Sequence, residues 1–354
     1  MTEALEKNIR KVVPYVPGEQ PKRSKMIKLN TNENPYPPAP GVERVLKEMD
    51  TDRFRLYPDP TADELVGSLA DYYGVGKDQV FVGVGSDDVL AVAFMTFFNG
   101  KKPIFFPDIT YSFYPVWAEL FAIPYEKKAV NDAFEIQKED YYAENGGVVF
   151  PNPNAPTGAF LSLEVVEDII KHNQDVVVIV DEAYIDFGGD TAKELTRKYD
   201  NVLVVQTYSK SRSLAGLRIG YAIGNKELIK AMNDVKYSYN SYTMNEPSIV
   251  LGTAVLEDEE YFQETRNKII DTREWFQTEM RKIGFSFADS KANFIFATHE
   301  SVPAKEIFEA AKKAKIYVRY FDQPRINDYL RITIGTREEM ETLLDFLKEF
   351  TAAK

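Results

Sequence analysis

The chain has no cysteine among its 354 residues. Disulfides, thiol nucleophiles and thiolate metal sites are therefore excluded, and this composition is typical of a reducing cytoplasm. Histidine is also scarce: His172 falls in a helical pattern and His299 in a turn, and both read as surface residues. We expect no metal site, so any catalysis must use lysine, aspartate, tyrosine, arginine or a cofactor.

The chain also lacks a surplus of positive charge and a long apolar run. Its net charge of −12 makes general binding to nucleic acid or to an anionic membrane unfavourable. The longest apolar run, residues 89–98, is far shorter than the roughly 20 residues of a membrane span. The N-terminus has no apolar signal core. We expect a soluble, cytoplasmic protein that acts on small molecules.

Short apolar runs alternate with helical patterns from about residue 61. This order predicts an α/β fold with a mostly parallel central sheet covered by helices. A long charged helical stretch at 258–282 and a mixed pattern after it predict a smaller α+β domain. Residues 31–41, rich in proline and asparagine, predict an extended arm. The expected divisions are an arm at 1–40 that packs with the small domain, a large domain at 41–245 and a small domain at 246–354.

Polar residues follow several predicted strands. Gly83 and Gly85 form a turn before Ser86, which occupies the expected N-cap of a helix, where free amides can bind an anion. The turn lacks the pattern of a P-loop and the third glycine of a dinucleotide fingerprint, and an ordinary capped turn explains it equally well. Asp181 ends the run VVVIV, at the sheet edge where α/β proteins bind ligands, although it could simply cap a turn.

A second group of polar residues is basic. Lys210 and Arg218 follow the run NVLVVQ, and a lysine that attacks a carbonyl needs desolvation or neighbouring cations to become neutral. A solvated basic loop is the alternative. Arg331 interrupts the apolar run YLRITIG, which favours either a buried ion pair or bidentate binding of a carboxylate or phosphate.

Taken in order, these motifs resemble the class I/II aminotransferases, the fold-type-I family that uses pyridoxal 5′-phosphate. The resemblance extends from NTNENPYPP to LRITIGT and includes LYPDP, GSDD, DEAYIDF and SKSRSLAGLRIG. It implies a Schiff-base lysine at Lys210 that also shuttles protons, Asp181 at the pyridine nitrogen and Tyr184 at the phenolic oxygen. The ring would then act as an electron sink.

The resemblance also implies the remaining cofactor contacts. Tyr111 would stack on the ring, and the phosphate would be held by Ser86, Asp87, Thr207, Ser209 and Arg218. Tyr57 would reach the phosphate in the partner subunit's site, which implies a homodimer. One position departs from the family. The family's loop usually reads Asn-Pro-Thr-Gly, whereas in this chain Ala155 stands before Pro156. Either Asn154, one residue earlier, hydrogen-bonds the ring oxygen, which we favour, or Tyr184 does so alone.

The subgroup that the chain most resembles transaminates L-histidinol phosphate with 2-oxoglutarate, in histidine biosynthesis, to imidazole-acetol phosphate and glutamate. Arg331 would bind the phosphate of one substrate and the carboxylate of the other, and Tyr15, Asn32 and Arg319 are further candidates for the substrate pocket. Three alternatives are an aromatic-amino-acid aminotransferase, a phosphothreonine decarboxylase on the same scaffold, and a nucleotide-binding or structural α/β protein. The last would have to treat five ordered motifs as coincidence.

Overall fold

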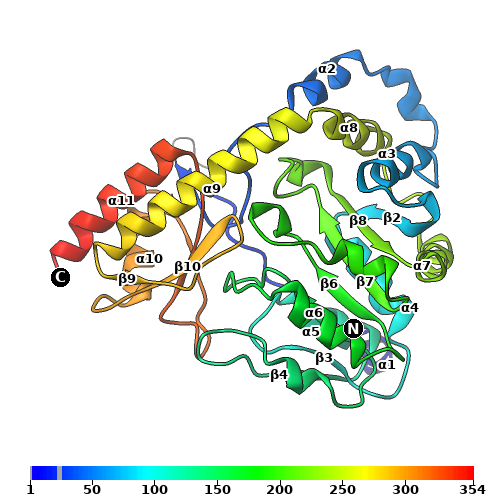
Figure 1. Ribbon diagram of the computed structural model, residues 1–354, viewed down its shortest axis with the longest axis horizontal. Coiled ribbons are helices and arrows are strands. Elements are labelled where there is room, and N and C mark those ends of the chain that lie inside the picture. The colour runs from blue at the N-terminus through cyan, green and yellow to red at the C-terminus, as the bar shows by residue number, and fades with distance from the viewer. Residues whose placement is uncertain (1, 22–25) are drawn as a thin grey trace.

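A seven-stranded sheet, in the order β2-β8-β7-β6-β5-β3-β4, is the largest element of the computed structural model, which describes residues 2–21 and 26–354 (Figure 1). β8 is antiparallel to its neighbours β2 and β7, and every other pair is parallel. The predicted mostly parallel sheet is therefore confirmed. Its strands are β2 (Val80–Val84), β3 (Ile104–Pro107), β4 (Tyr125–Lys128), β5 (Val148–Pro151), β6 (Val178–Asp181), β7 (Val202–Thr207) and β8 (Ile219–Gly224).

Helices cover both faces of this sheet. On β7, Val204 packs in a cluster with α6 (Leu163–Lys171), whereas Val205 packs in a cluster with α4 (Ser86–Phe97), α5 (Phe113–Phe121) and α7 (Lys226–Tyr239). Successive strand residues point to opposite faces, so a strand buried on both sides reads as a continuous apolar run. Short 3₁₀ helices connect other elements: η1 (Thr51–Arg55), η2 (Lys77–Gln79), η3 (Lys138–Tyr141), η4 (Ile185–Phe187), η5 (Ala192–Arg197) and η6 (Ala215–Leu217).

The C-terminal third builds a smaller antiparallel sheet, in the order β12-β13-β10-β9. Its strands are β9 (Phe285–Ser286), β10 (Phe294–His299), β12 (Arg319–Tyr320) and β13 (Leu330–Thr333). The helices around it are α9 (Glu259–Arg281), α10 (Ala304–Lys313) and α11 (Arg337–Ala352). β1 (Ile27–Lys28) pairs with β11 (Ile316–Tyr317), and Leu29 enters the core of this unit. Figure 1 shows α9, in yellow, running from the large unit to the small one.

The packing of α8 bears on the boundary expected between the two units. α8 (Glu246–Glu257) packs on α2 (Pro40–Glu48) and α3 (Asp63–Tyr73), and its Leu251 and Val255 belong to a core that also contains β2 and β8. The expected boundary after residue 245 therefore precedes a helix that packs with the large sheet. Ile269 is the first residue of α9 in the small unit's core. We propose that the boundary lies within α9.

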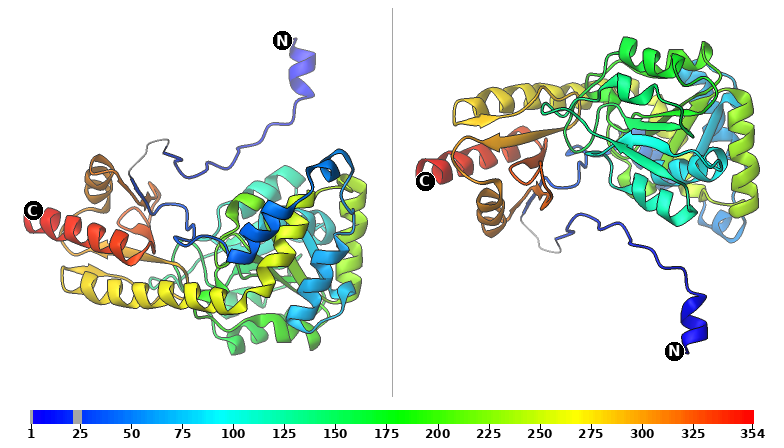
Figure 2. Two further views of the ribbon diagram at one scale, coloured as in Figure 1. Left: turned by 90° about the horizontal axis from the view of Figure 1, so that it is seen from above. Right: turned by 90° about the horizontal axis from the view of Figure 1, so that it is seen from below.

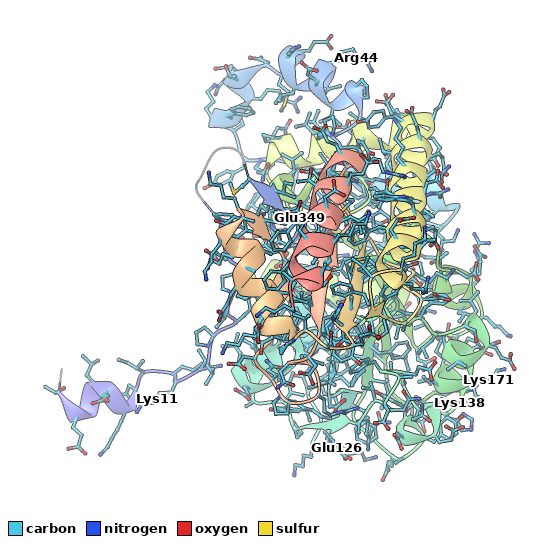
Figure 3. The ribbon with its side chains drawn as sticks, turned by 90° about the vertical axis from the view of Figure 1, so that its left-hand side faces the viewer. Lys11, Arg44, Glu126, Lys138, Lys171 and Glu349 are labelled. Carbon is cyan, nitrogen blue, oxygen red and sulfur yellow. The ribbon has the colours of Figure 1, made fainter. Side chains whose placement is uncertain are left out.

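The N-terminal arm has two different environments. Residues 27–29 join the small unit, as described, whereas α1 (Glu3–Lys7) stands away from the rest of the chain (Figure 2). Lys11 stands clear of the body in Figure 3, and Val13 is 75% exposed. Tyr15 returns to the large unit and stacks on Phe113 with ring centroids 4.1 Å apart. No helix among the described residues is long and apolar enough to cross a membrane.

Candidate active site

A cavity of about 250 Å³ lies where the carboxyl ends of β5, β6 and β7 face the small unit. Ligands of open α/β sheets bind at this edge, because loops there bring side chains from several strands together. Thirteen of the fifteen residues predicted for the site line the cavity: Tyr15, Asn32, Ser86, Asp87, Tyr111, Asp181, Tyr184, Thr207, Ser209, Lys210, Arg218, Arg319 and Arg331.

Lys210 lies in the turn after β7, and its side chain lines the cavity. Its Nζ donates a hydrogen bond to the carbonyl oxygen of Thr31 at 3.2 Å and lies 5.8 Å from the ring centroid of Tyr184. Asn34 Nδ2 donates to the Lys210 carbonyl oxygen at 2.9 Å. Among the described residues Lys210 forms no ion pair. The amine is thus held by a neutral acceptor only, which leaves it available for reaction.

Asp181 is the last residue of β6, and its carboxylate is buried. Oδ2 accepts a hydrogen bond from the hydroxyl of Tyr114 at 2.8 Å, and Oδ1 accepts from the amide of Ala183 at 3.3 Å. Burial raises the pKa of Asp181 to about 6, against the lowering effect of these hydrogen bonds. A carboxylate in this position gains most from a cationic partner inside the cavity.

Tyr114, which the sequence analysis did not predict, is fully buried on α5. Burial, and then the nearby Asp181 charge, hold the pKa of Tyr114 well above its usual range, so it remains a donor. Its only signal in the sequence is its position three residues after Tyr111, at the start of an aromatic helix. Tyr111 precedes the helix, and the two tyrosine rings meet edge-on with centroids 5.8 Å apart.

The glycine turn before α4 has the geometry that suits an anion. The first helix residue is Ser86 and the N-cap is Gly85, with φ 84°, so the predicted N-cap role of Ser86 is wrong. A Cβ on Gly85 would lie 2.5 Å from Nη2 of Arg218, which explains why a side chain cannot occupy the cap position. The first amides of the helix have no intrahelical acceptor, and they face the cavity beside the Arg218 guanidinium.

Hydroxyl and acidic side chains complete this anion site. Thr207 Oγ1 and Ser209 Oγ lie 3.0 Å apart, and Arg218 Nη2 donates to Asp87 Oδ2 at 3.0 Å. The hydroxyl of Tyr111 donates to Asp87 Oδ1 at 2.6 Å, and burial holds the pKa of Tyr111 well above its usual range. Asp87 therefore holds both Arg218 and Tyr111 beside the N-terminus of α4.

Two arginines form the small unit's side of the cavity. Arg319 and Arg331 are paired neighbours on β12 and β13. Arg331 Nη2 donates to the carbonyl oxygen of Asn30 at 2.9 Å, but its Nε is buried without a hydrogen-bond partner in the described part of the chain. Neither arginine forms an ion pair with any described residue, so the alternative of a buried structural ion pair at Arg331 is excluded there. Burial lowers the pKa of Arg331, and an anionic ligand would reverse this cost.

The two remaining predicted residues lie outside this cavity. Asn154 is buried, and its Nδ2 donates to the carbonyl oxygen of Ile109 at 2.9 Å and to Thr157 Oγ1 at 3.1 Å. Its Oδ1 accepts from Thr110 Oγ1 at 3.1 Å, so the amide is held both by its own loop and by the loop that follows β3. Asn154 thus does not line the cavity, and its expected hydrogen bond to the ring oxygen stays a prediction. Tyr57 is 83% exposed and does not line this protomer's cavity.

The architecture and this site are those of a pyridoxal-phosphate enzyme. A family model described as aminotransferase class I and II matches residues 24–347, and the chain belongs to this family. The histidinol-phosphate aminotransferase of Clostridium botulinum (strain Okra / Type B1) is 52% identical over 345 residues, which cover 98% of this chain and 97% of that one. The enzyme of the same name from Lactococcus lactis subsp. cremoris (strain MG1363) is 50% identical, with 99% and 98% covered.

Solved structures share the fold at low sequence identity. A histidinol-phosphate aminotransferase from Sinorhizobium meliloti in complex with pyridoxal-5′-phosphate has a TM-score of 0.84 at 21% identity, with 93% of this chain and 92% of that one covered. An L-threonine-O-3-phosphate decarboxylase from Porphyromonas gingivalis has a TM-score of 0.77 at 18% identity, covering 92% and 100%. The fold-type-I assignment is confirmed. The fold alone does not distinguish transamination from decarboxylation.

The protein is an aminotransferase whose cofactor is pyridoxal 5′-phosphate, and the residues present fit that group. The cofactor has an anionic phosphate, a pyridine nitrogen and an aldehyde. The helix start with Arg218 suits the phosphate, the buried carboxylate of Asp181 suits a protonated nitrogen, and the Lys210 amine suits the aldehyde. All three groups line a single cavity.

Proposed function

We propose that this enzyme transfers the amino group of L-histidinol phosphate to 2-oxoglutarate and yields imidazole-acetol phosphate and glutamate. The observation that carries the proposal is the pair Arg319 and Arg331, which line the cavity without a carboxylate partner in the described chain. A guanidinium group binds phosphate and carboxylate with the same bidentate geometry. One arginine pair can therefore serve the phosphate of the donor and a carboxylate of the acceptor in turn.

The names of relatives that are half identical to this chain support the same substrate. This choice also places the enzyme in histidine biosynthesis. The substrates are small and soluble, and together with the cysteine-free composition they support a cytoplasmic location.

The site residues divide the chemical work between them. When bound, the cofactor delocalises negative charge from the substrate's α-carbon into its ring. Asp181 would keep the pyridine nitrogen protonated, which strengthens this effect, and Tyr184 would donate to the phenolic oxygen. Lys210 would take the proton from the substrate's α-carbon and return it during the transfer. The amides at the start of α4, with Arg218, hold the phosphate and so fix the ring relative to Lys210.

A half-reaction experiment tests the substrate. The purified holoenzyme is mixed separately with L-histidinol phosphate, L-phenylalanine and L-threonine phosphate, without a keto acid, and the visible absorption is followed. Conversion by histidinol phosphate, reversed by 2-oxoglutarate, supports the proposal. Preferential conversion by phenylalanine would make the enzyme an aromatic aminotransferase, and carbon dioxide release from threonine phosphate would make it a decarboxylase. Lys210→Ala is the control, because it should abolish every conversion.

We further propose that the enzyme is a homodimer in which Tyr57 completes the partner's phosphate site. Tyr57 is highly exposed and packs on Tyr242 with ring centroids 4.7 Å apart. Leu5, Val13 and Val16 on the arm are also more than half exposed, which favours burial against a second copy. Hybrid dimers test this. Mixing Lys210→Ala with Tyr57→Phe subunits should restore one intact site per hybrid, whereas a Tyr57 that acts within its own subunit would give no recovery.

A further inference from the structure

Asn32 links Thr333 to Tyr184 in a chain of hydrogen bonds, and the donor and acceptor of each bond can be assigned. The backbone amide of Asn32 donates to Thr333 Oγ1 at 3.0 Å, and the Thr333 hydroxyl donates to Asn32 Oδ1 at 3.0 Å. Asn32 Nδ2 donates to the hydroxyl oxygen of Tyr184 at 3.0 Å. Asn32 is 1% and Thr333 2% exposed, so water does not substitute for these partners.

The direction of this chain follows from the backbone amide, which can only donate. Thr333 Oγ1 must accept from it, so the threonine proton needs another acceptor, and Asn32 Oδ1 is the one beside it. A reversed asparagine amide would place Nδ2 against Thr333 and leave the threonine proton buried without an acceptor, which is costly. Asn32 Nδ2 therefore faces Tyr184.

The asparagine itself is held in place by its backbone. Its φ of 56° is left-handed, a region that asparagine tolerates better than most residues. Asn293 Nδ2 donates to the Asn32 carbonyl oxygen at 3.0 Å. Tyr184, in turn, meets Phe294 edge-on, with ring centroids 5.1 Å apart, so its ring cannot swing to a new partner without losing this contact.

We propose that Asn32 is a positioning residue that makes Tyr184 a hydrogen-bond donor to the cofactor's phenolic oxygen. Because Nδ2 can only donate, the Tyr184 oxygen must accept from it, and the tyrosine's single proton stays available on the cavity side. Asn32 thus acts through Tyr184. This role differs from the direct contact with substrate that we expected from the sequence. The inference rests on the role proposed above for Tyr184.

The readout is the pH at which the visible absorption of the bound cofactor changes in the purified holoenzyme. A donor at the phenolic oxygen stabilises its anionic form and lowers this pH. Asn32→Asp keeps the shape of the side chain but replaces the donor by an acceptor, which would draw the Tyr184 proton away from the cofactor. We expect the transition to rise by roughly one pH unit, a tenfold change in the protonation equilibrium.

Uncharged variants separate hydrogen-bond direction from the added charge. Thr333→Val removes the hydroxyl that orients the amide, so we expect an upward shift in the same direction but smaller than for Asn32→Asp. Thr333→Ser keeps the hydroxyl and should restore the wild-type transition. Asn32→Ala leaves Tyr184 able to donate, so its shift should be smaller than those of Asn32→Asp and Thr333→Val. Asn145→Asp changes a buried asparagine outside the cavity and should cause no shift.

The order of these shifts distinguishes a positioning role of Asn32 from a purely structural one. A purely structural role predicts that Asn32→Ala, which removes the most atoms, has the largest effect, and that order would overturn the inference. So would an unchanged transition in both Asn32→Asp and Thr333→Val when Tyr184→Phe shifts it. If Tyr184→Phe has no effect either, the proposed role of Tyr184 is wrong as well. Cofactor content and urea unfolding of each cofactor-free variant verify that the folded holoenzyme is compared.

Discussion

The buried hydroxyl of Tyr114 donates its proton to Oδ2 of Asp181 across 2.8 Å. This contact joins α5 to the end of β6, although the two residues are 67 positions apart in the chain. It satisfies one oxygen of a carboxylate that burial would otherwise leave costly. It also fixes the direction in which the carboxylate meets the cavity, so a residue without a predicted role positions one that has a central role.

Tyr114→Phe should therefore weaken cofactor binding by roughly tenfold, because a hydrogen bond to a charged group is removed without a change of shape. The measurement is the dissociation constant of pyridoxal phosphate from the cofactor-free protein. Tyr141→Phe is a matched control, since the Tyr141 hydroxyl is buried but has no hydrogen-bond partner among the described residues. Equal affinities in the two variants would contradict the positioning role of Tyr114.

The carboxylate of Asp181 also predicts a pH dependence of stability. Its pKa of about 6 in the folded protein lies above the ordinary value of 3.8, so in this interval the folded cofactor-free protein binds more protons than the unfolded chain. Its stability should fall as pH rises through the interval, and the cost, on the order of 3 kcal/mol, should be fully present above pH 6.

Asp181→Asn removes this cost. Without cofactor, the variant should be more stable than the wild type at pH 8 and similar to it near pH 4. Urea unfolding at both pH values checks this, and the stabilisation caused by added cofactor should shrink in the variant because the pyridine nitrogen loses its anion. A variant less stable than the wild type at pH 8 would show that burial of the charged Asp181 carboxylate does not destabilise the folded protein.

Much of the site could be predicted because strand ends are readable from the sequence. Asp181 and Lys210 each follow a continuous apolar run, and the carboxyl ends of parallel strands share one edge. The role of Tyr114 could not be predicted, because its partner is set by the packing of α5 on the sheet. The same is true of Asn154, whose amide is oriented by the Ile109 carbonyl oxygen from another loop.

The packing of α8 on the large unit could not be predicted from the sequence for a related reason. α8 buries residues on most of its sides, including Ile249, Leu251 and Val255. Such a helix carries no one-sided apolar stripe that indicates which core it joins. Its contacts with α2 and α3 determine which core it joins, and these contacts depend on the tertiary arrangement.

Arg325 connects the loop that carries Phe321 to the large unit. Its Nη1 donates to Asp108 Oδ2 at 2.8 Å, and its Nη2 donates to the carbonyl oxygen of Val130 at 2.7 Å. Phe321 lines the cavity together with Arg319. Arg325→Met should raise KM for both substrates by roughly tenfold while cofactor affinity is kept, because only the substrate side of the site loses its support.

Steady-state kinetics with each substrate varied in turn checks this prediction. Arg281→Met is the control, because it removes an exposed ion pair with Asp289, and such pairs contribute little. An unchanged KM in Arg325→Met, or a loss of cofactor affinity equal to the loss of substrate affinity, would contradict it.

Arg273 on α9 ties the two units together from inside. Its side chain is 2% exposed, and Nη1 donates to the carbonyl oxygens of Phe187, at 2.9 Å, and Ala292, at 2.8 Å. Arg273→Met should destabilise the cofactor-free protein by about 3 kcal/mol, because two buried carbonyl groups lose their donor. Urea unfolding measures this, and Arg266→Met, a partly exposed position on the same helix whose guanidinium donates to the neighbouring Asn267, should change stability little. Phe187 follows Tyr184 by three residues, so weaker cofactor binding in Arg273→Met would link this interior contact to the active site. Equal stability of Arg273→Met and Arg266→Met would refute the structural role of Arg273.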